Sequence, residues 1–365
     1  MEPNGLIDEF GPEKIVIIYD QKTKTKGIVV IDNSALGPGK GGIRLVPDIT
    51  VTEVFRLARV MTWKNALAEL PFGGGKSGVK GDPHGDKSSM MKAFGRALKY
   101  LCPVEYLAGP DMGTGEEDIR AFVEGAGSLT AATGKPTDLG GLPHELGFTG
   151  FGVAESTEVA ADFAGIELKG TTVAIEGFGN VGSFATKFLS EKGAKIVAVS
   201  DSKGTIYDEN GLNYEELMKT KKEKGTVVEH TSGKRLPTAE LFGLPVGILI
   251  PGARPDVINE KNVGSVKAKI VVEAANLPVK MDSELVLHKK GILITPDLVA
   301  NAGGVISSYT EYIGGTKEQA FSLISEKIRK NTKLVLEKAK NESTQPREAA
   351  VSIAKERVIA AMAKR

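Results

Sequence analysis

The spacing of apolar residues along the first part of the chain alternates between two periods, and each period predicts a different element. Short runs rich in β-branched side chains predict strands, and apolar residues three or four positions apart predict helices. Residues 20–26 are polar and separate two such runs, which predicts an antiparallel hairpin. The predicted strands are residues 14–19, 27–31, 42–46, 77–79 and 104–108. The first predicted helix begins at Thr50 or Thr52 and ends near Lys64. Two further helices are predicted at residues 88–101 and 116–125.

Two polar stretches between these elements carry candidate chemistry. Residues 73–75 are three glycines, which we expect to form a loop that places Lys76 just before the next strand. Asp111 lies on the loop between a predicted strand and a predicted helix, a common position for catalytic groups, although an ordinary turn aspartate occupies such positions as well. Thr114 and Glu117 have the spacing of a capping box for the helix that follows.

The second part of the chain alternates strands and helices as a parallel sheet does. A strand at 172–176 runs directly into a glycine-rich turn that opens a helix, and an acid, Asp201, follows nineteen residues after the last glycine. This is the dinucleotide-binding fingerprint in the setting it requires. Its glycines permit a tight turn and let a pyrophosphate approach the helix N-terminus. The residues of the turn are Gly177, Phe178, Gly179, Asn180, Val181 and Gly182.

The fingerprint predicts NAD or NADP as cofactor. Asp201 would accept a hydrogen bond from the ribose 2′-hydroxyl of NAD, and the adjacent Ser202 and Lys203 would instead hold the 2′-phosphate of NADP. Ligands of parallel sheets bind beyond the carboxyl ends of the strands, so Ala253, Asn276 and Asn301 are candidate cofactor contacts, or else ordinary turn and capping residues. The further strands are predicted at 195–200, 247–250, 270–275 and 292–295, and the further helices at 153–164, 316–340 and 346–364.

Length and composition limit the class of protein. A chain of 365 residues predicts two domains, and the Gly/Pro-rich residues 134–152 mark the boundary between them. A net charge of +1 argues against nucleic acid or an anionic membrane as partner. The single Cys102 fits a reducing compartment, so we expect a cytoplasmic protein, and the N-terminal residues have no signal-peptide pattern. The four histidines lack zinc-ligand spacing, so we expect no metal site.

Residues 39–80 combine glycines with three lysines in apolar surroundings. Lys40 precedes two glycines, Lys64 follows a tryptophan, and Lys76 follows three glycines. Because burying an unpaired ammonium is costly, three converging lysines predict an anionic ligand, and they would lower one another's pKa so that one can act as a base. A solvated, lysine-rich loop explains the same spacing.

These stretches resemble the glutamate/leucine/phenylalanine/valine dehydrogenase superfamily over residues 15–311. The matching motifs are GPGKGGIRLVP, MTWKNALAELPFGGGKSGVKGDP, GPDMGTGEEDI, GFTGFGV, VAIEGFGNVGS, VVEAANLP and PDLVANAGGVISSYTE. The resemblance implies an α/β fold of two domains, a substrate domain over 1–148 to which the C-terminal helices of 309–365 return, and a Rossmann-type domain over 149–308. It also implies a cleft between them that closes, and reversible NAD(P)-dependent deamination of an L-amino acid to a 2-oxo acid and ammonia.

The resemblance also assigns roles to individual residues. Lys76 matches the catalytic lysine, and Lys64 matches the lysine that binds the α-carboxylate of the substrate. Asp111 matches the aspartate that exchanges a proton with the amino group. The cofactor contacts implied in the same way are Thr149 and Asn301 near the nicotinamide and Asn276 near its ribose.

Two positions decide the substrate within this family. Lys40 and Ser308 match the residues that hold the side-chain carboxylate in glutamate dehydrogenases, so we expect L-glutamate and 2-oxoglutarate as substrates. The alternatives are a leucine-, valine- or phenylalanine-type enzyme, which would require Glu145 to neutralise Lys40, and a non-catalytic dinucleotide-binding regulator. The resemblance further implies a homo-oligomer, a hexamer for the glutamate type and an octamer for the leucine type, of which we expect the hexamer.

Overall fold

A computed structural model describes residues 7–365 and divides into two compact units. The first unit comprises the chain up to residue 146 together with 305–320 and 351–365, and the second comprises 147–304 and 321–350. The sequence interpretation placed all of 309–365 in the first domain, whereas residues 321–350 pack within the second unit. Residues 1–6, part of the stretch for which we expect no signal peptide, lie outside the described residues.

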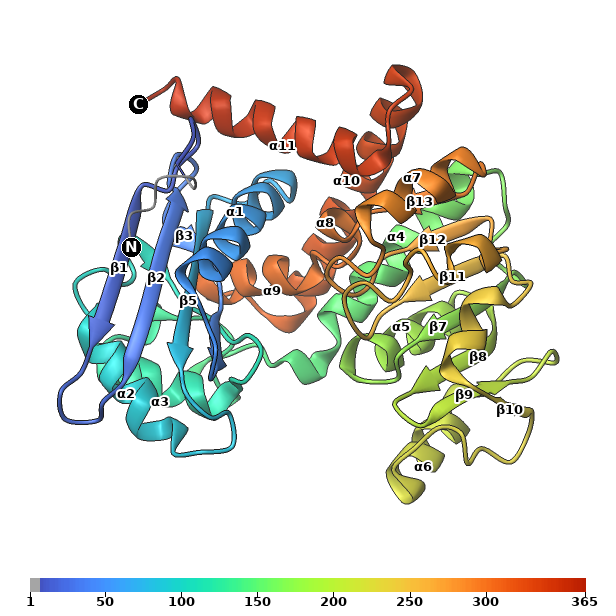
Figure 1. The fold of residues 1–365 in the computed structure, drawn as a ribbon, viewed down its shortest axis with the longest axis horizontal. Helices are drawn as coiled ribbons and strands as arrows, with labels where there is room; N and C mark the ends of the chain where they lie inside the picture. Colours follow the sequence, from blue (N-terminus) through green and yellow to red (C-terminus); the bar gives the residue numbers. More distant parts are fainter. Residues whose placement is uncertain (1–6) are drawn as a thin grey trace. The chain divides into compact units, whose positions relative to one another are not determined.

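The first unit is built on a mixed six-stranded sheet (Figure 1). Its order is β1-β2-β5-β3-β6, with β4 paired to β5. The first two strands form the predicted antiparallel hairpin, β2 and β5 are also antiparallel, and the remaining pairs are parallel. The strands are β1 (Lys14–Tyr19), β2 (Lys26–Asn33), β3 (Gly39–Lys40), β4 (Ile43–Val46), β5 (Gly73–Lys80) and β6 (Tyr106–Leu107).

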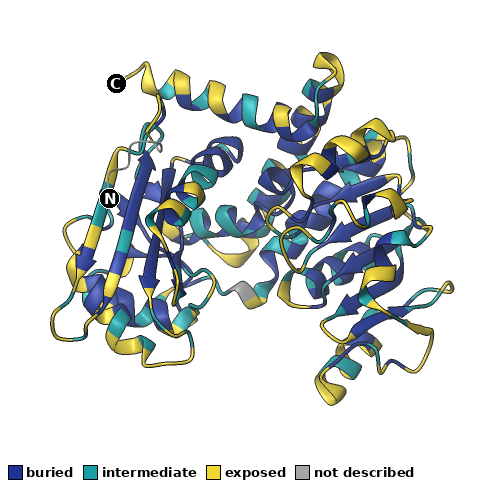
Figure 2. Cartoon of the chain, in the orientation of Figure 1, coloured by how far each residue is buried: buried dark blue, intermediate teal, exposed yellow. Residues whose placement is uncertain are grey.

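Helices cover both faces of this sheet. Because side chains alternate along a strand, Val30 faces the helix α1 (Val51–Leu67), whereas Val29 and Ile31 face α2 (Lys87–Leu98) and α3 (Glu116–Ala126). Burial follows the same arrangement, since the central strands β2 and β5 are buried along nearly their whole length and β1 carries exposed residues (Figure 2). This packing holds β5 rigidly between two layers of helix.

The glycines at 73–75 are part of β5, so the prediction of a loop there is wrong. A Cβ on Gly74 would lie 1.8 Å from Oγ1 of Thr62, and one on Gly75 would lie 2.9 Å from the backbone of Gly39. The glycines therefore serve close approach of α1 and β3 to the strand rather than a turn. As a consequence Lys76 lies within a central strand, with its side chain fixed by the sheet.

The predicted capping box of α3 is also wrong. The helix is capped at Gly115, whose N–H donates to the Asp118 carboxylate over 2.8 Å. The Thr114 hydroxyl is used elsewhere, because it accepts from the N–H of Asp111 at 2.9 Å and donates to the carbonyl of Ile43 at 2.8 Å. Thr114 therefore fixes the loop that carries Asp111 against β4.

The second unit contains a seven-stranded sheet of order β10-β9-β8-β7-β11-β12-β13. The five strands from β8 to β13 in this order are parallel, as the alternation of strands and helices predicted, and β9 and β10 add an antiparallel edge. The two-domain α/β class is thus confirmed. The strands are β7 (Thr172–Glu176), β8 (Lys195–Asp201), β9 (Gly204–Tyr207), β10 (Lys234–Leu236), β11 (Ile248–Pro251), β12 (Ile270–Val272) and β13 (Leu293–Thr295).

The helices of this unit differ from prediction at two points. The helix α4 (Phe148–Phe163) begins five residues before its predicted start at 153, so Thr149 lies in its first turn. Phe321 packs against Phe148 and Phe151 within the second unit, and not on the first domain as its apolar face suggested. The remaining helices of this unit are α5 (Asn180–Glu191), α6 (Tyr214–Lys224), α7 (Met281–Lys289), α8 (Asp297–Ala300) and most of α10 (Lys317–Glu342), whereas α9 (Gly303–Tyr312) and α11 (Pro346–Met362) lie mainly in the first unit.

Short 3-10 helices occupy several of the connections. Residues 134–152, expected to be an irregular boundary, contain two of them before α4 begins. Among residues 7–365, no helix has the length and apolar character needed to cross a membrane. The 3-10 helices are Leu129–Ala131, Thr137–Leu139, His144–Leu146, Thr238–Gly243 and Val263–Ser265.

Candidate active site

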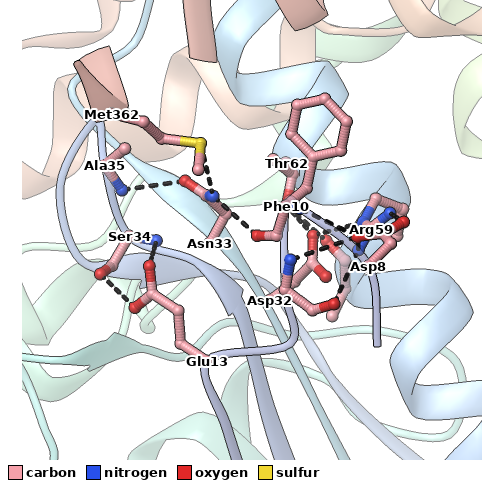
Figure 3. Close-up of polar contacts among 12 residues, drawn as sticks. Asp8, Phe10, Glu13, Asp32, Asn33, Ser34, Ala35, Arg59, Thr62 and Met362 are labelled. Atoms are coloured by element: carbon pink, nitrogen blue, oxygen red, sulfur yellow. Dashed lines mark hydrogen bonds and ion pairs between the residues drawn. The ribbon is translucent and has the colours of Figure 1, made fainter. Parts of the chain in front are cut away.

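The helix that carries Lys64 is anchored to the end of β2 by an ionic network (Figure 3). Arg59 Nε donates to Oδ2 of Asp32 at 2.8 Å, and the Thr62 hydroxyl donates to the same oxygen. The Arg59 guanidinium also binds both oxygens of Asp8. Because Asp32 is fully buried, these contacts are charge-assisted bonds in a dry setting, and they fix α1 next to β5. Lys64 is only 6% exposed in the last turn of this helix.

Lys40 and Lys76 leave the sheet on the same face. Lys40 pairs in register with Gly74, and Lys76 lies two residues further along β5, so the period of two places both side chains on one side. That side is the one covered by α1, since Gly74 lies directly beneath Thr62. Strand pairing therefore places two of the three lysines that were predicted to converge, Lys40 and Lys76, on the same side of the sheet.

Lys40 is buried, and its ammonium donates to the carbonyl of Ala108 at 2.7 Å. Burial lowers the pKa of Lys40 to about 7, and the positive charges of Lys76 and Lys135 act in the same direction, against the opposing carboxylate of Glu311. The acid that acts on Lys40 is thus Glu311, on α9, which the sequence interpretation did not single out. Glu311 accepts from the ammonium of Lys135 and from three backbone N–H groups, of Gly134, Lys135 and Leu142.

Asp111 binds two cations through one oxygen. Its Oδ2 accepts from Arg44 Nε at 2.9 Å and lies 3.1 Å from Lys76 Nζ. Arg44 is held from its other side by Glu53, whose Oε1 lies 2.8 Å from Nη1. The structure therefore brings together Lys76 and Asp111, the two predicted catalytic residues, and adds Arg44, which the KGGIR motif contains but to which sequence interpretation gave no role.

The ionisation of this pair follows from burial and charge. Burial lowers the pKa of Lys76, Asp111 opposes that change, and the positive charge of Arg44 adds to it. Burial alone would raise the pKa of Asp111, but Lys76 and Arg44 outweigh it and hold that pKa below its ordinary value. The site thus combines an ionised acid with a lysine that loses its proton more easily than usual.

Glu145 interacts with another acid. Burial, and then a hydrogen bond to Glu145 and the negative charge of Glu145, raise the pKa of Glu116 to about 7. Ser308 lies partly exposed on α9, in the same unit as Lys40.

The glycine-rich turn of the second unit has the geometry that a pyrophosphate requires. Gly177 has a φ of +94°, and a Cβ on Gly182 would lie 1.8 Å from the carbonyl oxygen of Gly177, so both positions need glycine. Gly179 is the N-cap of α5 and has open space where a Cβ would stand. A bare helix start beside open space fits an anionic pyrophosphate, so the residues present suit a dinucleotide.

The carboxylate of Asp201 is already used within the second unit. Its Oδ1 accepts from the N–H of Lys203 at 2.9 Å and from the hydroxyl of Thr226 at 3.0 Å. Its Oδ2 accepts from Lys221 Nζ at 2.7 Å and from the N–H of Val227 at 2.9 Å. Because a carboxylate has about four acceptor positions, these donors leave little capacity for a ribose hydroxyl.

Three more predicted cofactor residues, Ala253, Asn276 and Asn301, lie in the segments that follow the carboxyl ends of strands. Nδ2 of Asn301 donates to Oδ1 of Asn276 at 3.0 Å, which joins the loops after β12 and β13. The N–H of Ala253 donates to the carboxylate of Glu176 at 2.8 Å, so the loop after β11 is tied to the end of β7. Within residues 7–365, no group of three or more His, Cys, Asp or Glu side chains is arranged to hold a metal ion.

A second ionic cluster supports this edge of the sheet. Arg347, at the start of α11, binds three buried acids, with Nε 2.6 Å from Glu284, Nη1 2.8 Å from Asp297 and Nη2 2.5 Å from Glu273. Asp297 also accepts from the N–H of Leu277 at 2.9 Å. The cluster therefore fixes the loop that contains Asn276 and the short helix α8, whose C-cap is Asn301.

Comparison with known proteins identifies the family. The sequence profile described as Glutamate/Leucine/Phenylalanine/Valine dehydrogenase matches residues 140–365, and the profile described as Glu/Leu/Phe/Val dehydrogenase, dimerisation domain, matches residues 13–126. A glutamate dehydrogenase of Aeropyrum pernix is 44% identical over 354 residues, which cover 90% of this chain and 84% of that protein. An NADP-specific glutamate dehydrogenase of Saccharolobus shibatae is 38% identical, covering 96% of this chain and 89% of that protein.

A solved structure agrees with these relatives. The hetero-hexameric glutamate dehydrogenase of Thermus thermophilus, in its Leu-bound form, superposes with a TM-score of 0.85 at 28% identity, covering 96% of this chain and 89% of that chain. Fold, fingerprint and relatives together define a two-domain amino acid dehydrogenase that uses NAD or NADP. The chain belongs to the glutamate/leucine/phenylalanine/valine dehydrogenase family, and the resemblance inferred from its motifs is confirmed.

Proposed function

We infer that this protein is a glutamate dehydrogenase, which converts L-glutamate reversibly to 2-oxoglutarate and ammonia with NAD or NADP. The names and extent of the similar relatives support this activity, since glutamate dehydrogenases 38–44% identical to the chain match over most of its length. The substrate domain is the first unit, and the dinucleotide belongs to the second.

The observation that carries the choice of glutamate is the burial of Lys40 beside other cations. An ammonium in this position lacks the water that would stabilise its charge, and the nearby Glu311 carboxylate is paired with Lys135, so an anionic ligand would stabilise the charged form of Lys40. The side-chain carboxylate of glutamate supplies that anion, and an aliphatic side chain would leave the charged donor unpaired. Ser308 is the second donor in this proposal, and Lys64 holds the α-carboxylate.

The chemistry falls to Lys76 and Asp111. In the deamination direction, loss of hydride from Cα leaves an iminium, and Lys76 in its neutral form takes a proton from the water that attacks that carbon. Asp111 removes and returns protons on the substrate nitrogen. The dinucleotide, when bound, supplies the hydride acceptor or donor.

The cofactor site lies at the carboxyl ends of the strands in the second unit. Thr149, Asn276 and Asn301 contact the nicotinamide riboside in this proposal, and Asp201 shapes the loop at the adenosine end. The hydrogen bond from Asn301 to Asn276 holds the two amides in one arrangement, which suits a fixed nicotinamide. The pyrophosphate contacts are Gly177, Gly179, Asn180, Val181, Gly182 and Ala253.

We further propose a cytoplasmic homo-oligomer, a hexamer. The dimerisation domain matched by residues 13–126 and the hexameric assembly of the Thermus thermophilus relative support the oligomer. The single, buried Cys102 supports a reducing compartment. Light scattering should give a mass six times that of the 38.6 kDa chain.

The activity is tested by initial rates of NADH and NADPH oxidation with ammonia and 2-oxoglutarate. We expect turnover that requires ammonia, and the same plate identifies the preferred dinucleotide. Faster turnover of 4-methyl-2-oxopentanoate would assign the chain to the leucine type instead, and dinucleotide binding without turnover of any 2-oxo acid would make it a regulator.

A further inference from the structure

The two oxygens of the Asp111 carboxylate have different surroundings. Both cations that bind it, Arg44 and Lys76, contact Oδ2, and among residues 7–365 no hydrogen bond or ion pair reaches Oδ1. The side chain of Asp111 is about one-fifth exposed, so Oδ1 is the oxygen available to a ligand. An acid that exchanges protons with a substrate nitrogen needs one such oxygen.

We propose that Arg44 is a positioning residue of the reaction, which holds Oδ2 of Asp111 so that the acid stays ionised, with Oδ1 left for the substrate nitrogen, while Lys76 gives up and regains its proton. The proposal rests on the function inferred above and deepens it. It assigns to Arg44 a part in the proton chemistry without any contact with the substrate.

The need for a second cation follows from the cycle itself. Lys76 must be neutral when it takes the proton from water, and at that moment it no longer offers a full charge to Asp111. Arg44 cannot lose its proton under these conditions, so it remains a permanent cation on Oδ2. Its charge also repels the proton on Lys76, which favours the neutral lysine. One guanidinium thus keeps the acid charged and the base uncharged.

Arg44 is itself held in place. Its Nη1 donates to Glu53 at 2.8 Å, and the N–H of Glu53 donates to the capping hydroxyl of Thr50 at 3.2 Å. Arg44 is therefore clamped between the first turn of α1 and the loop after β6. The charged groups that act on the Lys76–Asp111 pair or on its neighbours come from β3, β4, α1, α9 and the segment after α3. Arg44 acts on both members of the pair, Glu53 acts on Arg44, and Lys40 interacts with Lys76 and in turn with Lys135 and Glu311.

The test compares Arg44→Gln with Arg44→Lys through the pH dependence of kcat/KM for glutamate deamination. Removal of the charge raises the pKa of Lys76, so the ascending limb should move to higher pH by roughly one unit in Arg44→Gln. Arg44→Lys keeps the charge and should restore most of the wild-type limb. Glu53→Gln, which frees the guanidinium but leaves its charge, should move the limb less than Arg44→Gln does.

A readout that does not need turnover separates this proposal from the function. Competitive acetylation of Lys76 with acetic anhydride, followed by peptide mass spectrometry, reports the pKa of that lysine in each variant. An alkaline shift in Arg44→Gln supports the proposal even if the enzyme acts on another amino acid. Equal Lys76 titration in wild type and Arg44→Gln, with only a lower kcat, would overturn it and leave Arg44 a structural residue. If Arg44→Gln does not fold, Glu53→Gln and Arg44→Lys decide in the same assay.

Discussion

In the first unit, two cations, Arg44 and Lys76, share one oxygen of a single acid, whereas in the second unit Arg347 alone holds three acids. The Arg347 cluster is buried, whereas Arg44 and Asp111 of the first cluster are partly exposed, and each cluster has an excess of one sign. The first has more positive than negative charge close to Asp111, and the second has three carboxylates for one guanidinium. The first cluster is therefore stabilised by an added negative charge, and the second by an added positive charge.

This difference indicates that the first cluster is a binding site and that the second is a structural support. An excess of buried cations is relieved by an anionic ligand, and glutamate brings two carboxylates to the first cluster. The acidic cluster can be relieved from within, because burial raises the pKa of Glu273 and of Glu284 and lets the cluster retain a proton. It then serves to hold the loops that carry Asn276 and Asn301. The experiments that follow test whether the first cluster binds substrate and the second stabilises the fold.

Replacement of Lys76 should have the largest effect on turnover. Lys76→Met removes the base while keeping an apolar stem, so kcat should fall by roughly 10³-fold or more. Dinucleotide affinity, measured by fluorescence titration, should stay within about twofold because the dinucleotide belongs to the second unit. A variant that retains a tenth of the wild-type kcat would show that Lys76 is not the base.

Replacement of Arg347 should lower the free energy of unfolding more than it lowers the rate of catalysis. Arg347→Met leaves three buried acids without a cation, which should cost about 3–5 kcal/mol of unfolding free energy, measured by denaturant titration. A second variant, Arg347→Met with Glu273→Gln, should recover part of that loss, since it removes one of the repelling charges. A loss below about 1 kcal/mol in Arg347→Met would contradict the scaffold role.

Much of this arrangement was predictable where the signal is local. The two hydrophobic periods and the turn from Gly177 to Gly182 predicted the parallel sheet of the second unit, because strand, turn and helix are adjacent in the chain. The motif around Lys40 predicted the family and the cluster of lysines. Asp111 was expected on a loop before a helix, and it lies on one.

The features that the sequence did not reveal depend on contacts between residues that are far apart in the chain. The three glycines of β5 looked like a loop because their reason, the approach of Thr62 and Gly39, lies elsewhere in the sequence. The ribose contact of Asp201 stays a prediction, but its sequence position did not reveal that Lys221 and Val227, 20 and 26 residues further on, donate to its oxygens. Arg347 lies 74 residues from Glu273, so no local pattern connects them.

The affinity for 2-oxoglutarate should depend on pH through Lys40. The free enzyme loses the Lys40 proton near pH 7, and the dicarboxylate needs the protonated form. The dissociation constant should therefore rise as the pH increases above about 7, by at most about tenfold per unit. Isothermal titration between pH 6 and 9 measures it, with 4-methyl-2-oxopentanoate, which has no side-chain carboxylate, as the matched ligand. Parallel pH profiles for the two acids would contradict a role for Lys40.

Replacement of Asp201 should have the smallest effect on catalysis. Asp201→Asn weakens four internal hydrogen bonds without removing a direct ribose contact, so the ratio of kcat/KM for NADH to that for NADPH should change less than about threefold. A selective loss of NADH activity by tenfold or more would mean that the carboxylate reads the 2′-hydroxyl after all.

The central claim is that the buried cations of the first unit select a dicarboxylate. Its most direct test is the ratio of kcat/KM for 2-oxoglutarate to that for 4-methyl-2-oxopentanoate, measured in the wild type and in Lys40→Leu. The wild-type ratio should be well above one, and Lys40→Leu should lower it by about 10²-fold or more, mainly through loss of 2-oxoglutarate turnover. An unchanged ratio in Lys40→Leu would contradict the claim, because the cation would then have no part in the choice of substrate.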